Sequence, residues 1–172
     1  MNFQGIYDRI RSIQAPGVTG MDEPREPNPQ DKKDKGRSGD PYVLVDPQRL
    51  PEFLECLRDD PSLKFELMAD LTATDPSKED GYLWINVQLL SLVRKHRLAV
   101  KCLLPKENAV MPSSVSVHRG AQWAERECSE MYGITFEGHP DPRNILLPED
   151  WIGHPLRKDY EFPEEYHGIS CK

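Results

Sequence analysis

The sequence lacks long apolar runs. None approaches the ~18 consecutive apolar residues that mark a membrane-spanning helix. Residues 1–17 have neither an apolar signal-peptide core nor a small-residue cleavage site, so we do not expect secretion. Only 37% of the residues are hydrophobic and the mean hydropathy is −0.67. We therefore expect a modest core and well-solvated segments.

Cysteine is sparse and widely spaced. The four cysteines are Cys56, Cys102, Cys128 and Cys171, and the two nearest in sequence are 26 positions apart. This excludes a CxxC pair and the familiar local spacings of zinc and iron–sulfur ligands. The sequence also lacks a GxSxG, P-loop or GxGxxG motif. We expect buried or half-buried thiols plus one tail thiol, with no cofactor or metal bound by this chain.

Positive charge is scarce in the last third of the chain. Residues 121–172 hold 11 acidic and 5 basic side chains, a balance of −6, whereas the whole chain carries −7. An acidic segment is a poor ligand for nucleic acid or for anionic lipid headgroups. It suits basic protein partners, because charge complementarity guides docking.

The first half of the chain predicts one helix at each side of a linker. Ile6, Ile10 and neighbouring apolar residues form a short amphipathic pattern, whereas residues 15–41 are rich in proline and charge and predict a flexible linker. A strand is predicted at Tyr42–Val45. The Asp46-Pro47 step then predicts the start of a helix whose apolar residues recur at helical spacing.

The middle of the chain predicts a sheet. Residues 65–73 alternate loosely as a strand does, and residues 82–92 and 98–104 predict a hairpin with a basic tip, RKHR, at 94–97. Residues 106–119 predict a loop with at most a short strand. We therefore expect an α+β fold, with a small antiparallel or mixed sheet and packed helices. We divide the chain into a flexible extension (1–40), an α+β domain (41–132) and an extended partner-binding arm (133–172).

A second helix is predicted from Gly120 to Tyr132, with Gly133 as its C-terminal cap. Glu125 and Glu127 fall on opposite edges of its apolar stripe, so they do not form an acid/base pair across a cleft. Arg126 and Glu130 are expected to pair on the outer face. A bidentate bond from Arg143 to Glu127 would lock the arm to this helix.

The arm is punctuated by prolines but keeps large anchors such as Trp151, Tyr160 and Phe162. A segment that cannot fold on itself yet keeps such side chains usually lies against another surface. His139 and His154 occupy two Gly-His-Pro steps fifteen residues apart. We expect each histidine to bond backbone groups in a tight turn, and the alternative is a metal site with Asp141, Asp150 or Cys128 as further ligands.

The residues from Glu125 to Tyr160, ERECSEMYGITFEGHPDPRNILLPEDWIGHPLRKDY, resemble the signature of the 30 kDa-type subunit (the C subunit) of respiratory complex I. The match is looser over residues 42–104, where FELMADLTATD and LLSLVRKHRLAVKCLLP also resemble the family. Glu130 stands where the family often has Asp, and Pro142 where Leu is common.

The resemblance implies a cofactor-free subunit of the peripheral arm of a proton-translocating NADH:quinone oxidoreductase. It would pack against the subunits that carry the terminal iron–sulfur cluster and the quinone pocket, with NADH, FMN, iron–sulfur clusters and quinone bound by partners. Its place would be the cytoplasmic face of the bacterial inner membrane, or the matrix or stroma side in an organelle. The resemblance implies that this chain has no catalytic residue. It also implies the following candidates for contact with partner subunits: Glu125, Arg126, Glu127, Tyr132, Gly133, His139, Arg143, Trp151, His154, Arg157, Lys158 and Tyr160.

Two alternatives stay open at this point. One is the equivalent subunit of a related membrane-bound hydrogenase or of a ferredoxin- or deazaflavin-dependent dehydrogenase, because the electron donor binds elsewhere. The other is a stand-alone metal-dependent hydrolase built on the arm's histidines and aspartates, which would bind stoichiometric metal.

Overall fold

The computed structural model describes residues 1–23 and 40–170. In chain order its elements are α1 (Phe3–Ser12), β1 (Val18–Asp22), β2 (Tyr42–Val45), the 3-10 turn η1 (Pro47–Arg49), α2 (Leu50–Asp59), β3 (Leu67–Thr74), β4 (Tyr82–Ser91), β5 (His96–Pro105), β6 (Val110–Pro112), α3 (Ala121–Tyr132), β7 (Thr135–Glu137), β8 (Glu165–Tyr166) and β9 (Ile169–Ser170).

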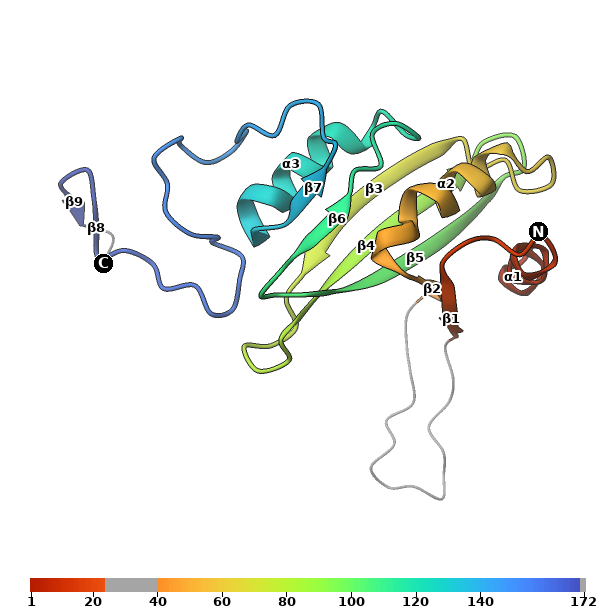
Figure 1. Cartoon of the computed structure of the whole chain (residues 1–172), viewed down its shortest axis with the longest axis horizontal. Helices are drawn as coiled ribbons and strands as arrows, with labels where there is room; N and C mark the ends of the chain where they lie inside the picture. The colour runs from red at the N-terminus through yellow and green to blue at the C-terminus, as the bar shows by residue number, and fades with distance from the viewer. Residues whose placement is uncertain (24–39, 171–172) are drawn as a thin grey trace, which may run out of the picture.

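The centre of the molecule is a five-stranded sheet in the order β1-β2-β5-β4-β3. The β2–β5 pair is parallel and the other pairs are antiparallel, so the sheet is mixed. The β4–β5 hairpin pairs Tyr82 with Pro105 at one end and Ser91 with His96 at the other. Helices α2 and α3 lie on the same side of the sheet (Figure 1). This confirms the predicted α+β fold with a mixed sheet and packed helices.

The core lies between the sheet and α2, because apolar residues alternate along the strands and recur at helical spacing in α2. Leu83, Ile85, Val87 and Leu89 of β4 are buried on one face, while the residues between them are at least partly exposed. The four apolar residues of α2 are fully buried against that face. Asp46 begins this element as predicted, since its side chain accepts the Gln48 N–H, although the first turn is a 3-10 turn.

The N-terminal segment joins the same core. Helix α1 buries Ile6 and Ile10, and Arg9 reaches Asp60 at 2.6 Å, just after α2. Strand β1 lies inside the predicted linker and pairs with β2, so the prediction of an unstructured segment is wrong for residues 18–22. The strand forms because backbone pairing satisfies the edge of β2, which composition does not reveal. The rest of the predicted linker, residues 24–39, lies outside the described residues, and the three-part division of the chain stays a prediction.

The connection from the sheet to the arm contains a second, two-stranded sheet. Strand β6 falls in the predicted loop 106–119, which confirms its one short strand, and it pairs in parallel with β7. Strand β7 belongs to the body, because Ile134 and Phe136 are buried in the core. The chain leaves the body only after β7 and ends with the β8–β9 hairpin (Figure 1).

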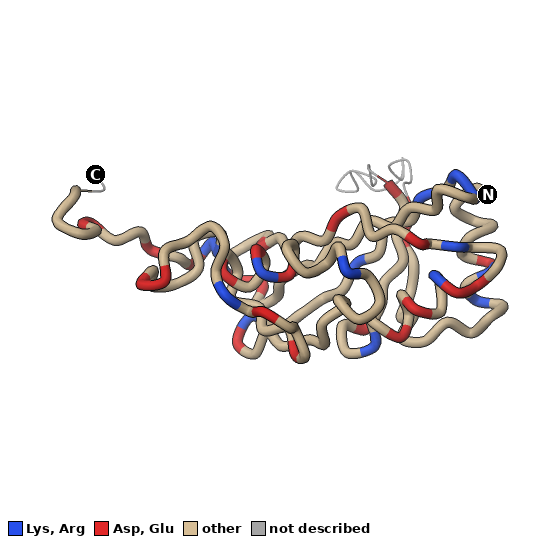
Figure 2. The backbone as a smooth tube through the Cα atoms, turned by 90° about the horizontal axis from the view of Figure 1, so that it is seen from above, with Lys and Arg blue, Asp and Glu red and all other residues tan. Residues whose placement is uncertain are grey.

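From residue 138 to residue 164 the arm has no helix or strand. It runs along α3 and then prolongs the molecule along its long axis (Figures 1 and 2). Acidic residues recur along its length in Figure 2. Within residues 1–23 and 40–170, no helix is long and apolar enough to cross a membrane.

Candidate functional site

The arm turns away from α3 at Gly133. This residue has φ +71°, and its N–H bonds the Ser129 carbonyl at 2.9 Å, which completes the predicted C-terminal cap. A Cβ added at Gly133 would lie 2.5 Å from the His154 ring. Nδ1 of His154 lies 2.9 Å from the Glu130 carbonyl. Glycine is therefore required twice here, once for the backbone angle and once for the close approach of the arm.

The Glu130 side chain holds the arm by its backbone. Its carboxylate accepts the N–H groups of Ile145, Leu146 and Leu147 at 3.0–3.2 Å, and the residue is only 4% exposed. The predicted Arg126–Glu130 pair on the outer face is therefore wrong. Glu130 does lie off the apolar stripe of α3, but the arm covers it, and three residues at least fifteen positions further along the chain supply its partners. Three N–H groups that no helix or sheet satisfies are paired in this way.

Arg126 holds the preceding part of the arm. Its Nε donates to the Arg143 carbonyl at 2.7 Å and its Nη2 to the Asn144 carbonyl at 3.3 Å. Its guanidinium also lies 5.3 Å from the Trp123 ring centroid and 3.6 Å from Asp141. One arginine of α3 thus satisfies two successive carbonyls of the irregular chain.

The predicted Arg143–Glu127 bond does not form. Arg143 instead makes a bidentate pair with Asp141, at 2.7 and 2.9 Å, and Glu127 is exposed to solvent. The bond from Arg143 lowers the pKa of Asp141 to about 2. A partner two residues away in the same turn is reached without ordering a long side chain across to the helix, so the local pair wins.

The two arm histidines bond backbone groups in turns, which confirms their interpretation as turn residues. Nδ1 of His139 accepts the Asp141 N–H at 3.0 Å, and Nε2 lies 3.0 Å from the Gln122 carbonyl. A carbonyl can only accept, so Nε2 donates to it while Nδ1 accepts. Both ring nitrogens of His139 are occupied within the chain.

A second anchor joins the arm to the end of the sheet, and sequence reasoning misses it. The Asp75 carboxylate, fully buried, pairs with Lys106 at 2.7 Å and accepts the Lys158 N–H at 2.9 Å. Arg157 donates to the Lys106 carbonyl at 2.7 Å. Burial raises the pKa of Asp75, but the bonds from Lys106 and from the Lys158 backbone outweigh it and hold the pKa below its usual value. One signal in the sequence could have found this pair: Asp75 lies shortly before β4 and Lys106 directly after β5, so opposite charges flank the β4–β5 hairpin.

The far part of the arm is held by aromatic contacts. Tyr160 donates to the Ile152 carbonyl at 3.3 Å, and its ring would lie 2.6 Å from a Cβ at Gly153, whose φ is +86°. The Trp151 and Tyr166 rings are 5.3 Å apart, and Tyr166 donates to Asp150 at 2.9 Å. These contacts fold the segment 150–166 back on itself.

The two glutamates near the start of α3 differ in exposure. Glu125 is fully buried, where its carboxylate accepts the Ser113 hydroxyl and the Ser114 N–H, both at 2.6 Å. Burial raises the pKa of Glu125, and the two bonds offset only part of that effect. Of the interface candidates, Glu125 thus binds inside the chain, Tyr132 packs beside the core, and Glu127, Arg143 and Lys158 are exposed.

With its backbone turned inward, the arm presents apolar side chains outward. Four are exposed by 48–87%: Leu146, Ile152, Leu156 and Phe162. Beside them an open groove of about 770 Å³ lies between α3 and the arm, with Trp123 and Arg126 on one side and Pro142 and Glu149 on the other. Trp123 is 66% exposed. Exposed apolar side chains on a rigid, irregular segment are typical of a protein–protein contact.

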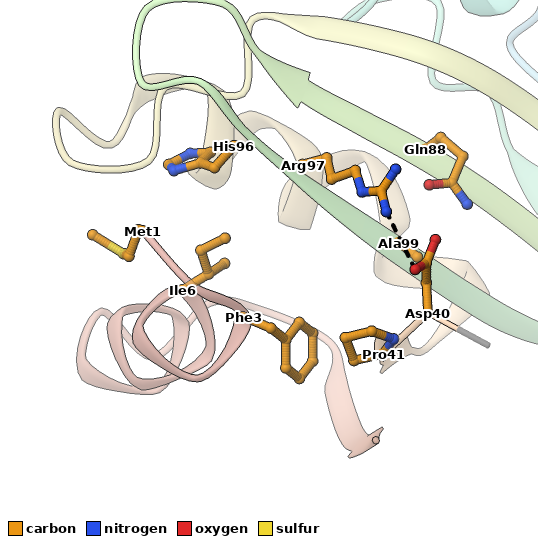
Figure 3. A pocket seen from close by; sticks show the side chains of 9 residues that line it. All are labelled: Met1, Phe3, Ile6, Asp40, Pro41, Gln88, His96, Arg97 and Ala99. Atoms are coloured by element: carbon orange, nitrogen blue, oxygen red, sulfur yellow. Dashed lines mark hydrogen bonds and ion pairs between the residues drawn. The ribbon is translucent and has the colours of Figure 1, made fainter. Parts of the chain in front are cut away.

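A separate cavity of about 280 Å³ lies at the other end of the molecule (Figure 3). Met1, Phe3 and Ile6 face His96, Arg97 and Ala99 of β5 across it. His96 is engaged through Nε2, 2.7 Å from the Leu63 carbonyl, and Arg97 pairs with Asp40 at 3.3 Å. The described residues contain no group of three or more His, Cys, Asp or Glu side chains arranged to hold a metal ion.

The three thiols that the structure describes are buried or half-buried, as predicted. Cys102 and Cys128 are buried and Cys56 is half-buried, all three free, and Cys171 lies outside the described residues. Burial raises the pKa of both Cys102 and Cys128 to about 12, so neither is a thiolate at neutral pH.

Comparison with known proteins points to one family. The model of the family described as respiratory-chain NADH dehydrogenase, 30 Kd subunit, matches residues 43–166. The C subunit of NADH-quinone oxidoreductase from Chloroherpeton thalassium is 39% identical, over 90% of this chain and 70% of its own. The corresponding protein of Chlorobium phaeobacteroides, which has the same name, is 42% identical, over 75% and 78%.

Two solved structures share the fold. A trypsin-resistant fragment of Nqo5, residues 1–134, has a TM-score of 0.57 at 23% identity and covers 82% of this chain and 99% of its own. A chain of the membrane-bound sulfane sulfur reductase, an archaeal respiratory membrane complex, has a TM-score of 0.64 at 22% identity, over 92% and 85%. The family model and the curated relatives together show that this chain belongs to the 30 kDa subunit family of respiratory-chain NADH dehydrogenase.

Proposed function

We propose that the chain is a structural subunit of a proton-translocating NADH:quinone oxidoreductase, holding no cofactor and no catalytic residue, and that its arm docks on neighbouring subunits. The observation that carries this proposal is the orientation of the arm. Its backbone groups are bonded to Glu130, Arg126 and Asp75, while its apolar side chains stay exposed. A rigid segment of this kind loses little conformational entropy when a partner covers it.

The partners in this proposal are the other subunits of the peripheral arm, above all those that carry the terminal iron–sulfur cluster and the quinone pocket. They would bind NADH, FMN, the iron–sulfur clusters and quinone. The chain would then lie at the cytoplasmic face of the inner membrane, or on the matrix or stroma side in an organelle, and touch the membrane only through these partners. The names of its relatives support membership of an NADH:quinone oxidoreductase.

The interface candidates take two roles in this proposal. Arg126, Gly133, His139, His154 and Arg157 shape and anchor the arm through the contacts given above. The exposed candidates Glu127, Arg143 and Lys158 meet the partner directly. Ile152, which is not among the candidates, joins them because it is 87% exposed.

A second candidate function has one observation in its favour. The fold also occurs in the archaeal sulfane sulfur reductase complex, so an equivalent subunit of a related membrane-bound hydrogenase or ferredoxin- or deazaflavin-dependent dehydrogenase would have the same architecture. That likeness concerns the fold alone. The electron donor of the purified complex separates the two candidates.

The test is purification of the full-length, tagged chain from its native membranes in mild detergent. We expect iron–sulfur and membrane subunits to co-purify, together with NADH-driven quinone reduction. With the double variant Leu146→Ser/Ile152→Ser, the yield of co-purified complex should fall by at least about tenfold, because two exposed apolar anchors are lost. The matched control is Leu67→Ser/Leu103→Ser, two leucines of the sheet that are each 40% exposed.

Three outcomes would contradict the proposal. Equal recovery of complex by both double variants would refute docking through the arm. Hydrogenase or ferredoxin-dependent activity in the purified sample would favour the second candidate. Stoichiometric metal and hydrolase activity in the isolated chain would refute a non-catalytic role.

A further inference from the structure

The turn between β4 and β5 projects two aliphatic side chains into solvent. Leu92 is 61% exposed and Val93 is 71% exposed. They are adjacent in sequence and occupy the tip of a hairpin whose strands are ten residues long. The arm does not use this tip, which lies at the end of the sheet opposite the arm (Figure 1).

The tip is held in a fixed shape. The Glu66 carboxylate accepts the N–H groups of Leu92 and Val93 at 2.8 and 3.1 Å. Ser91 accepts the Arg94 N–H at 3.1 Å, and the Arg94 guanidinium donates to the Pro61 carbonyl at 2.6 Å. A preformed shape of this kind favours binding because the turn loses little conformational entropy when a partner binds it.

Glu130 holds the arm in the same way. There too a carboxylate accepts consecutive backbone N–H groups beside an exposed leucine, Leu146. The hairpin tip therefore repeats, at the other end of the molecule, the construction of the arm.

Positive charge surrounds the two aliphatic side chains. Arg94, Lys95 and Arg97 are all exposed at this tip, although the chain as a whole carries −7. Arg97 also pairs with Asp40, an exposed contact that salt screens and a partner carboxylate can replace. The surface complementary to this tip is an apolar recess with acidic residues at its rim.

We propose that the 91–97 turn is a second docking element, which inserts Leu92 and Val93 into an acid-rimmed apolar recess of a neighbouring protein subunit. It rests on the proposed function only in taking the chain to be part of a complex. Arg157 of the arm contacts Lys106, just beyond the other end of β5. Ten residues at about 3.4 Å each place the tip about 34 Å from this contact of the arm.

A protein fits this tip better than a membrane does. The Glu66 carboxylate, bonded to the Leu92 and Val93 N–H groups, offsets part of the attraction of the three cations for anionic headgroups. The turn also lacks Trp and Tyr, which anchor proteins at membrane interfaces. A fixed pair of aliphatic side chains can be matched in shape by a recess in a folded protein, whereas a fluid bilayer has no fixed shape to match.

The experiment places a photo-crosslinking amino acid at position 93 of the full chain within the complex, with position 119 as control, an exposed arginine site before α3. We expect position 93 to crosslink to a peptide of another subunit that contains at least two Asp or Glu residues. A crosslink to lipid or to a second copy of this chain would overturn the proposal. A crosslinking yield at position 93 no higher than that at position 119 would also overturn it.

A second measurement uses charge. Lys95→Glu should weaken retention of the chain during washes of rising salt by about tenfold, whereas Arg119→Glu should leave it unchanged. Equal retention of the two variants would overturn the proposal. A tagged chain that recovers no other subunit refutes the proposed function itself, whereas a normal complex without a position-93 crosslink refutes only the second docking element.

Discussion

Replacing Glu130 with Gln tests whether a single carboxylate fixes the arm. The wild-type side chain accepts three consecutive backbone N–H groups, from Ile145, Leu146 and Leu147. An amide keeps the shape but has only one acceptor oxygen, which can serve at most two of them. Its NH₂ group would face donors instead of accepting from them.

The expected loss follows from the strength of these bonds. A bond to a charged acceptor contributes about 1.5–3 kcal/mol and a neutral one about half as much. Losing the charge and one of three bonds should weaken docking of this part of the arm on the body by at least about 3 kcal/mol. That corresponds to a roughly hundredfold larger population of the undocked arm. The body does not depend on these bonds, so its global stability should change little.

Hydrogen exchange measures this directly. In Glu130→Gln, exchange at the amides of Ile145, Leu146 and Leu147 should accelerate by about a hundredfold, up to the limit set by global unfolding. Amides of β4 and β5 should be unaffected. The matched control is Glu127→Gln, the same change at an exposed position of the same helix. Unchanged protection at the three amides, or an equal loss in the sheet, would refute the reasoning.

Three further predictions concern the anchors and the buried carboxylate. Gly133→Ala should destabilise the protein by about 2–4 kcal/mol, because it combines positive φ with a clash against the His154 ring, and thermal unfolding will measure it. Asp75→Asn should leave Lys106 buried without its counter-ion and cost about 3 kcal/mol, whereas a melting temperature equal to wild type would contradict this. The raised pKa of Glu125 makes its contribution largest below pH 4.5 and progressively lost as the pH rises through the folded-state pKa. Melting curves of Glu125→Gln against wild type should therefore favour the variant increasingly as pH rises, and a constant difference would count against it.

Local periodicity in the sequence predicts the elements that are determined by residues close together in the chain. The apolar spacing of α2, the alternation in β4 and β5 and the Gly133 cap are each set by neighbours within a few residues, and the structure confirms them. Strand β1 escapes prediction because its pairing partner lies beyond residues 24–39 and its own five residues hold no buried side chain.

The side-chain partners are harder to predict, for the same reason. Helical geometry states which residues share a face of α3, but it does not state what will cover that face. Helical spacing places Glu130 in solvent because the arm that buries it follows fifteen residues later and has no period of its own. Charge alone favours Glu127 as the partner of Arg143, and the Asp141 turn beside Arg143 supplies a nearer one.

The family signature gains a physical meaning from these contacts. The residues that carry the resemblance, such as Arg126, His139, His154 and Arg157, point at the backbone of the chain itself. Ile152, within the same stretch, is 87% exposed and contributes only its backbone carbonyl to the arm. A sequence that fixes the course of an irregular segment must specify each polar partner, since no regular ladder does so. The signature therefore marks the shape of the arm, whereas in the proposed docking it is the exposed apolar side chains that meet the partner.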